Sequence, residues 1–304
     1  MAELLVVGSV ALDTVQTPFG KVQEALGGSA TYFSYAASFF TRVRLVGAVG
    51  SDFPEEHLRL LKERGVDLSG LMTSPNGRTF RWTGEYGYDL NEAKTIETQL
   101  NVFADFRPAL GEDARRAPFV FLANIDPELQ WDIVRQMTPR PRLIALDTMN
   151  FWIQGKREAL LRVLRQVDVI TINEAEVRQL AGEPNLIKAS RAITAMGPRT
   201  VVVKRGEYGA LMLTEGSFVV VPAYPPDSVY DPTGAGDTFA SGFMGYLAAQ
   251  ESLDVSTVRR AVVYGSVMAS FTVEDFSLGR LARLKPPEIA ERYAAFHELI
   301  RIPG

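Results

Sequence analysis

The stretch Asp231-Pro-Thr-Gly-Ala-Gly-Asp237-Thr-Phe-Ala-Ser-Gly-Phe243 determines how the rest of this sequence is interpreted. A strand-like apolar segment, residues 219–223, precedes it, and hydrophobic residues follow at helical spacing, among them Phe239 and Phe243. Gly234, Ala235 and Gly236 are therefore predicted at a helix N-terminus, where free backbone N–H groups and the helix dipole favour an anion. Small residues also let the backbone approach a phosphate closely.

Asp237 follows directly on this predicted anion cradle. A carboxylate would repel an anion that is only bound there, but it can accept the proton of a hydroxyl that attacks phosphorus. The simpler interpretation is that Asp237 only caps the helix. No Walker A motif is present, and Gly234-x-Gly236 lacks the third glycine of a dinucleotide fingerprint. The stretch therefore predicts phosphoryl transfer to a hydroxyl and argues against a dinucleotide oxidoreductase.

Short apolar runs alternate with segments of helical period along most of the chain. The predicted strands are Leu4–Val7, Arg44–Val49, Phe119–Ala123, Leu143–Leu146, Val167–Ile172 and Thr200–Val203. The predicted helices are Ala30–Phe40, Glu55–Arg64, Leu129–Met137, Arg157–Leu164 and Glu174–Leu180, with three more beginning near Asp237, Val255 and Pro287. This alternation predicts a mainly parallel sheet with helices on both faces. Leu211–Leu213 and Phe218–Val221 predict an antiparallel hairpin at its edge.

One region interrupts this rhythm. Residues 77–104 are β-prone, mix polar with aromatic side chains and show no helical stripe. Together with the extended segment at about 14–26 they are predicted to form a small sheet, a lid on a single domain of residues 1–304. An ordinary edge hairpin is the alternative.

Composition excludes several classes of function. The chain of 304 residues has a net charge of −4 and no basic tract, which argues against a nucleic-acid or anionic-membrane partner. It has no cysteine and only two histidines, His57 and His297, so thiolate chemistry and histidine-rich metal sites are not expected. Ala261–Val273 is shorter than the roughly 20 residues that span a bilayer. With no signal-like N-terminus, we expect a cytoplasmic protein.

Several separated motifs occur in a consistent order. They are Gly8-Ser-Val-Ala-Leu-Asp13, Gly27-Gly28, Val46-Gly-Ala-Val-Gly-Ser-Asp52, Asn173-Glu-Ala-Glu176, Val203-Lys-Arg-Gly206 and the stretch from Asp231. As a set they resemble the ribokinase family (PfkB-type carbohydrate kinases), which also contains adenosine and other nucleoside kinases. The resemblance covers nearly the whole chain. It implies a three-layer α/β/α ribokinase-like sandwich with a small β-sheet lid, and ATP-dependent phosphorylation that uses Mg²⁺.

The resemblance also implies roles for the acceptor side of the site. Asp237 would be the general base, and the amides of Gly234 to Gly236 would hold the charge of the transferring group. Asp13 would bind hydroxyls of the acceptor, with Gly27 and Gly28 turning their backbone toward it. Taken alone, Asp13 follows a buried strand and could be an ordinary turn residue, and the two glycines could only form a turn.

On the nucleotide side the resemblance implies roles for Asn173, Glu176, Lys204, Gly206 and Thr233. Glu176 would hold Mg²⁺ through water rather than directly. Lys204 would neutralise phosphate, and Gly206 would admit the nucleotide close to the backbone. The alternatives are that Asn173 and Glu176 cap a helix and that Lys204 is a surface residue at a strand end.

Other positions are interpreted more simply. Asp231, with Thr233, resembles a position where some family members bind K⁺. Gly47, Gly50 and Asp52 are interpreted as structural. The small residues of 265–271 would either lie against an adenine or serve helix packing.

Two departures from the family pattern bear on the acceptor. Ala11 and Tyr32 stand where ribokinase-like members commonly carry Asn, so polar contacts to a sugar are lost. The predicted lid also carries four aromatic residues, Phe80, Trp82, Tyr86 and Tyr88. They could stack on a base or a pyranose ring, form the core of the lid, or make a homodimer contact through it.

The acceptor is thus predicted as a small molecule, first a sugar and second a nucleoside. The stretch from Asp147 to Trp152 is partly similar to the Asp-x-Asn-x-Arg motif of sugar and sugar-acid kinases but lacks its arginine, which argues against a sugar acid. The rival from another class is a non-catalytic protein that binds a sugar or nucleotide.

Overall fold

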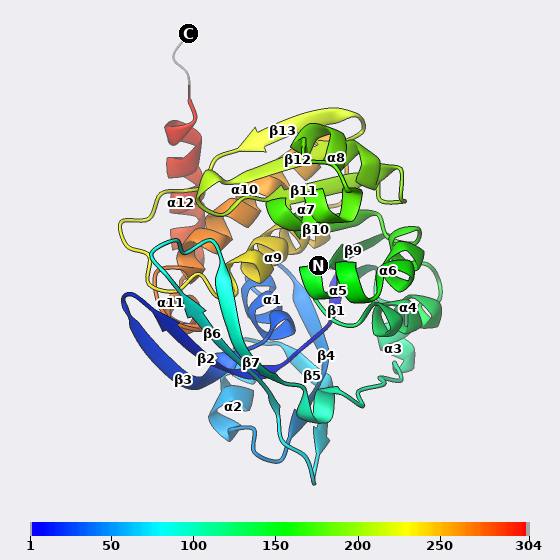
Figure 1. Cartoon of the computed structure of the whole chain (residues 1–304), viewed down its shortest axis with the longest axis vertical. Helices are drawn as coiled ribbons and strands as arrows, with labels where there is room; N and C mark the ends of the chain where they lie inside the picture. The colour runs from blue at the N-terminus through cyan, green and yellow to red at the C-terminus, as the bar shows by residue number, and fades with distance from the viewer. Residues whose placement is uncertain (1, 302–304) are drawn as a thin grey trace.

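The computed structural model describes residues 2–301 and contains a nine-stranded sheet with helices on both faces (Figure 1). Its strands are β1 (Glu3–Val7), β4 (Arg42–Gly50), β5 (Asp67–Ser74), β8 (Phe119–Leu122), β9 (Leu143–Asp147), β10 (Val169–Asn173), β11 (Thr200–Lys204), β12 (Ala210–Thr214) and β13 (Ser217–Val221). The order across the sheet is β13-β12-β11-β10-β9-β8-β1-β4-β5. All neighbours from β11 to β5 are parallel, and β12 and β13 add the antiparallel edge that the sequence predicted.

The apolar runs become central strands because both faces of the sheet are covered. Leu4 and Val6 of β1 belong to one hydrophobic core, whereas Leu5 and Val7 belong to the other. Successive side chains of a strand point to opposite faces, so a strand buried on both sides reads as a continuous apolar run. The helical layers therefore follow from the sequence of the strands.

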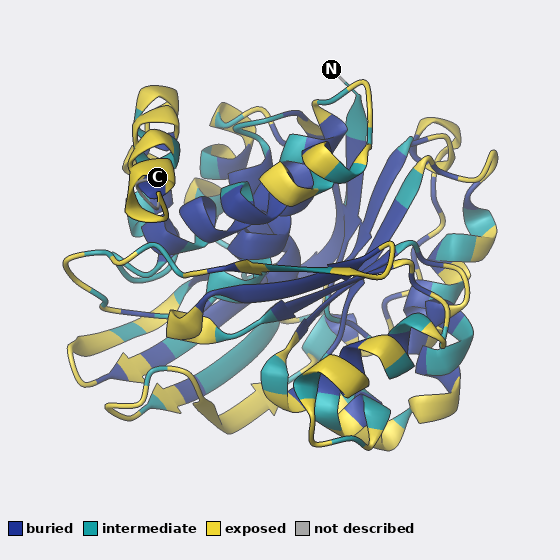
Figure 2. Ribbon diagram, turned by 90° about the horizontal axis from the view of Figure 1, so that it is seen from above, coloured by how far each residue is buried: buried dark blue, intermediate teal, exposed yellow. Residues whose placement is uncertain are grey.

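The two faces carry different helices, and Figure 2 shows the buried residues concentrated around the sheet, with exposed residues on the outer sides of the helices. One face carries α1 (Ser29–Ala37), α2 (Glu55–Glu63), α9 (Ala235–Ala248), α10 (Val255–Thr272), α11 (Gly279–Arg283) and α12 (Pro286–Leu299). The other carries α3 (Glu112–Arg115), α4 (Pro127–Gln136), α5 (Asn150–Gly155), α6 (Arg157–Leu164), α7 (Glu174–Ala181) and α8 (Leu186–Thr194). This confirms the predicted three-layer α/β/α architecture.

A second, four-stranded sheet stands beside the main one (Figure 1). It runs in the order β3 (Gly20–Gly27), β2 (Ala11–Thr17), β6 (Phe80–Tyr86) and β7 (Ala93–Gln99). Because β2 pairs in parallel with β6, the two predicted segments form one separate sheet, and the alternative of an ordinary edge hairpin is wrong. Asp52 ties this sheet to the main body, since it accepts from the Arg81 guanidinium at 2.8 Å and from the Thr79 N–H at 2.7 Å.

The structure corrects some details. The sequence interpretation missed β5, α8 and the short helices α3, α5 and α11, as well as the 3₁₀ turns Asn101–Phe103 and Gly206–Tyr208. Asp13 lies within β2, whereas it was expected in the turn after the first strand. Within residues 2–301, no helix combines the length and apolar character needed to cross a membrane.

Candidate active site

The carboxyl ends of the parallel strands gather the charged residues of the candidate site. Asp147 ends β9, Asn173 ends β10 and Lys204 ends β11, and these strands are direct neighbours. In open α/β sheets this edge is where ligands bind. The apolar strands thus bring side chains from three distant parts of the chain to one place.

Lys204 and Asp147 form a buried ion pair at this edge. Nζ of Lys204 donates to Oδ2 of Asp147 at 2.6 Å, and the two side chains are only 17% and 4% exposed. Burial lowers the pKa of Lys204, but the charges of Asp147 and Glu176 outweigh it, so the pKa is raised overall and the ammonium stays charged. A second oxygen of Asp147, Oδ1, accepts from the Thr148 N–H at 2.8 Å.

The glycine-rich stretch enters α9 beside this pair. Gly234 is the N-cap residue in the left-handed region, φ 77°, and Ala235 and Gly236 begin the helix. A Cβ added at Gly236 would lie 3.1 Å from Nζ of Lys204. The N–H of Ala235 donates to the Pro232 carbonyl at 3.1 Å, so Gly236 is the first residue of the helix whose amide can meet the fixed cation at a phosphate.

Asp237 lies in the first turn of α9, next to these amides. Burial and then the charge of Asp147 raise its pKa to about 7, against the opposing effect of Lys204. A general base works best when its pKa lies near the working pH. The expectation that Asp237 only caps the helix does not hold, because Gly234 is the N-cap and no side-chain cap bond is present there.

Asp13 is the residue predicted to bind hydroxyls of the acceptor. It is 5% exposed, and its Oδ2 accepts from the Gly28 N–H at 3.3 Å. A Cβ at Gly27 would fall 1.9 Å from the same oxygen, so the glycine pair is required for the approach of this carboxylate. Burial raises the pKa of Asp13 to about 7, opposed by the Gly28 bond and helped by the charges of Asp231 and Asp237.

Two tyrosine side chains contact the glycine-rich stretch. Tyr32 of α1 packs its ring on Gly234, where a Cβ would lie 2.4 Å from the ring carbons. Tyr86 of β6 accepts a hydrogen bond from the Thr233 hydroxyl at 3.4 Å, and burial raises its pKa to about 12. The small sheet thus reaches the main body at the stretch predicted to hold the phosphoryl group.

Asn173 and Glu176 form the capping box of α7. Oδ1 of Asn173 accepts from the Glu176 N–H at 2.8 Å, and Oε2 of Glu176 accepts from the Asn173 N–H at 3.0 Å. The capping interpretation is therefore confirmed. Glu176 is also buried beside Lys204 and Asp147, and burial raises its pKa to about 7.

Gly206 adopts φ 55° in the turn after β11, and its surroundings were not predicted. The loop between β6 and β7 lies against it, with Oδ1 of Asn91 at 1.9 Å from the position of an added Cβ. Asn91 also accepts from the Glu207 N–H at 3.3 Å. The small sheet therefore contacts the strand end predicted to face the nucleotide.

The remaining predicted residues have structural partners. Asp231 is fully buried, and its oxygens accept from the N–H groups of Thr233 at 2.9 Å and Ser277 at 3.4 Å. Gly265 of α10 packs on the backbone of Phe239 in α9, which favours helix packing at that position.

The aromatic residues of β6 differ from one another. Phe80 packs edge-on against Phe103, and Trp82 lies over Gly84 with its indole N–H on Thr95 at 3.2 Å. Tyr88, which follows the end of β6, is 91% exposed. Tyr86 is the aromatic residue of β6 that reaches the predicted site.

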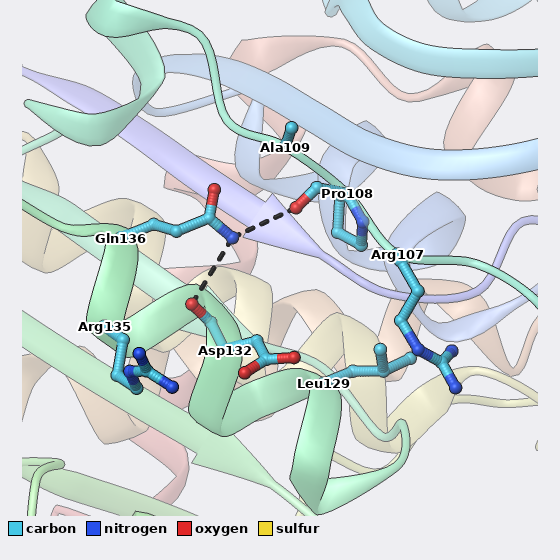
Figure 3. Close-up of a pocket in the computed structure, with 7 residues that line it drawn as sticks. All are labelled: Arg107, Pro108, Ala109, Leu129, Asp132, Arg135 and Gln136. Atoms are coloured by element: carbon cyan, nitrogen blue, oxygen red, sulfur yellow. Dashed lines mark hydrogen bonds between the residues drawn. The ribbon is translucent and has the colours of Figure 1, made fainter.

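A surface depression of about 320 Å³ lies elsewhere, lined by residues 107–109 and by one side of α4 (Figure 3). Gln136 closes it by donating to the carbonyls of Pro108 and Asp132. The depression shares no residue with the site described above, so it carries no part of the chemistry.

Sequence reasoning missed the ion-pair role of Asp147 and the contacts of Tyr86 and Asn91. Asp147 follows a buried apolar run, so its place at a strand end was a usable signal. The two contacts from the small sheet join residues more than 100 positions apart, and no local pattern indicates them.

Residues 1–281 match the model of the pfkB family carbohydrate kinases. A cytidine kinase of Thermococcus kodakarensis is 31% identical over 248 residues, which is 80% of this chain and 88% of that protein. A nucleoside kinase of Methanothermobacter thermautotrophicus is 26% identical over 286 residues, 90% of each chain. The crystal structure of a putative ribokinase II from E. coli with ATP and Mg²⁺ superposes with a TM-score of 0.77 at 18% identity, covering 97% of this chain and all of that one.

Proposed function

The chain belongs to the PfkB family of carbohydrate kinases and is an ATP-dependent kinase, and we propose that it phosphorylates a primary hydroxyl of a nucleoside with Asp237 as general base. The observation that carries this proposal is the placement of Asp237. It lies in the first turn of α9, directly after the glycine-rich amides, and it interacts electrostatically with both Lys204 and Asp13. A protein that only binds a nucleotide gains nothing from a carboxylate at this point.

Each residue has a defined task in the proposed reaction. Asp13 accepts hydrogen bonds from the acceptor and orients it, and Asp237 takes the proton of the hydroxyl as it attacks the γ-phosphorus. The amides of Gly234 and Gly236 hold the charge of the transferring group, and Lys204 adds a fixed positive charge beside them. Because the reaction needs mainly positioning and charge stabilisation, these groups suffice on the protein side.

The residues present fit a Mg²⁺ ion bound with the nucleotide. No group of three acidic or histidine side chains within residues 2–301 forms a complete metal cage, and Mg²⁺ characteristically keeps waters and binds through one or two carboxylates and phosphates. Glu176, buried and close to Lys204, is the carboxylate that would hold it through water. Bound Mg²⁺ would neutralise charge on the phosphates. A role for K⁺ near Asp231 remains a prediction, tested by exchanging KCl for choline chloride.

The small sheet is proposed to act as a lid. Its contacts at Thr233 and Gly206 touch both the predicted phosphoryl site and the predicted nucleotide side, so its closure would exclude water from the reaction. Homodimerisation through this sheet remains a prediction.

A nucleoside is favoured over a free sugar as the acceptor. The relative at 31% identity is named a cytidine kinase, and Ala11 and Tyr32 offer no amide to a sugar ring. This reverses the order that the sequence suggested, in which a sugar came first.

The test is a panel of acceptors with ATP and Mg²⁺, assayed for ADP release and for the phosphorylated position by phosphorus NMR. We expect turnover with at least one of cytidine, uridine and adenosine, and phosphate on the primary hydroxyl. Turnover with ribose or fructose alone would overturn the nucleoside assignment. If the folded protein releases no ADP with any of these acceptors, the proposed function is wrong.

A further inference from the structure

Two side chains at the predicted acceptor position have polar atoms without a partner among the described residues. Oδ1 of Asp13 is buried and accepts no hydrogen bond, although Oδ2 of the same carboxylate is bonded to Gly28. Tyr32 is only 2% exposed, and its hydroxyl, which is not fully enclosed, makes no hydrogen bond to another described residue. Buried polar groups in folded proteins are nearly always paired, so the unpaired Oδ1 of Asp13, with a free phenol near it, points to a missing ligand.

The position of the Tyr32 hydroxyl is fixed by packing. All nine residues of α1 are buried, and the ring lies on Gly234 so closely that a Cβ there would be 2.4 Å from it. Four ionisable groups face the hydroxyl: Asp13 of β2, Tyr86 of β6, and Asp231 and Asp237 of the glycine-rich stretch. Asp13 has the strongest electrostatic influence of the four. Because its ring packs on Gly234 and its hydroxyl is influenced by both Asp13 and Asp237, Tyr32 lies beside the predicted acceptor position.

A hydroxyl of the acceptor can satisfy both groups at once. It donates to Oδ1 of Asp13, which accepts when the carboxylate is ionised, and it accepts from the phenol O–H of Tyr32. We propose that Tyr32 contacts the acceptor and determines specificity by donating a hydrogen bond to the non-reacting hydroxyl that Asp13 orients. This rests on the proposed function, because it requires an acceptor with a second hydroxyl besides the one that reacts at Asp237.

The test compares Tyr32→Phe with wild type, using Tyr35→Phe as the matched control. Phe keeps the ring on Gly234 and removes only the hydroxyl. Tyr35 is buried on the same helix but faces Arg64 and Glu63, away from the acidic groups of the site. For Tyr32→Phe we expect the acceptor KM to rise about 2- to 10-fold, the range for one neutral hydrogen bond, with the KM for ATP unchanged. Tyr35→Phe should leave both constants unchanged.

Acceptors that lack one hydroxyl identify the contact. With 2′-deoxy and 3′-deoxy forms of the nucleoside that wild type accepts, one form should show no further effect of Tyr32→Phe, because the contacted group is already gone. The same form should lose at least about tenfold in kcat/KM with wild-type enzyme, since both Asp13 and Tyr32 are then left unpaired. This second measurement needs no variant and decides the matter if Tyr32→Phe proves unstable.

The outcomes separate the inference from the proposed function. Suppose that wild type phosphorylates a nucleoside but Tyr32→Phe leaves the acceptor KM unchanged, or changes it equally for the nucleoside and its 2′-deoxy and 3′-deoxy forms. A water molecule then satisfies Asp13 and Tyr32, and the inference is wrong. A changed KM for ATP alone would also overturn it. If wild type phosphorylates no acceptor, the proposed function fails first and the inference fails with it.

Discussion

Replacing Lys204 by Met separates the structural role of this side chain from its role beside the phosphoryl group. The ammonium is paired with Asp147 at 2.6 Å, and the carboxylate side chain is 4% exposed. Removing one partner of a buried pair costs about 3–5 kcal/mol, because the other charge stays buried without compensation. The Thr148 N–H still donates to Asp147, so we expect a loss near the lower end, about 3 kcal/mol. For a chain of this size that corresponds to a fall of roughly 6 °C in the unfolding temperature.

The double variant Lys204→Met/Asp147→Asn then distinguishes the two roles. With both charges gone, the unfolding free energy should return to within about 1 kcal/mol of wild type. The turnover number should stay about 10²–10³ below wild type, because no cation then lies beside Gly236. Urea unfolding and ADP release measure the two quantities, and Lys188→Met, on the exposed side of α8, is the control. Wild-type turnover in the double variant would refute the assigned role of Lys204, and a cost below about 1 kcal/mol for Lys204→Met would refute the buried pair.

Three further outcomes are expected. Burial and the charge of Asp147 raise the pKa of Asp237 to about 7, and a general base must be ionised to act. We therefore expect kcat/KM to fall as the pH drops below 7, and a profile that stays flat down to about pH 5 would contradict this. Gly234→Ala should lower kcat by about 100-fold with an unchanged circular dichroism spectrum, because the backbone angle φ of 77° and the Tyr32 ring both exclude a Cβ. A near-normal kcat would show that the glycine-rich stretch tolerates the displacement that this Cβ causes. Asp13→Asn should raise the unfolding free energy relative to wild type by an amount that grows from about pH 4, where the unfolded carboxyl ionises, and levels off at about 4 kcal/mol above about pH 7, where the folded carboxyl has ionised as well. A gain that is equal at pH 5.5 and 8.5, by thermal unfolding, would contradict the raised pKa of Asp13.

The main fold could be predicted because both faces of the sheet are covered. Strands such as Leu143–Leu146 and Thr200–Val203 read as continuous apolar runs, and the helices between them show a clear period. β5 was missed for the opposite reason. It is an edge strand with no fully buried residue, so Asp67–Ser74 has no apolar run to indicate it.

The candidate site could be predicted only where a local pattern carries it. The glycine-rich stretch places Gly234 and Asp237 at a helix N-terminus by its spacing alone, and the structure places them there. The Lys204–Asp147 pair and the Tyr86–Thr233 contact depend on which strands are neighbours and on how the small sheet docks. These are properties of tertiary packing, which no local pattern contains.

The most direct test of the central claim is single-turnover phosphorylation by Asp237→Asn. The substitution keeps the size of the side chain and removes the base. We expect the rate of the chemical step to fall by at least about 100-fold, while ATP and the acceptor still bind with wild-type affinity in calorimetry. A variant that binds both ligands and turns over at the wild-type rate would show that Asp237 is not the base.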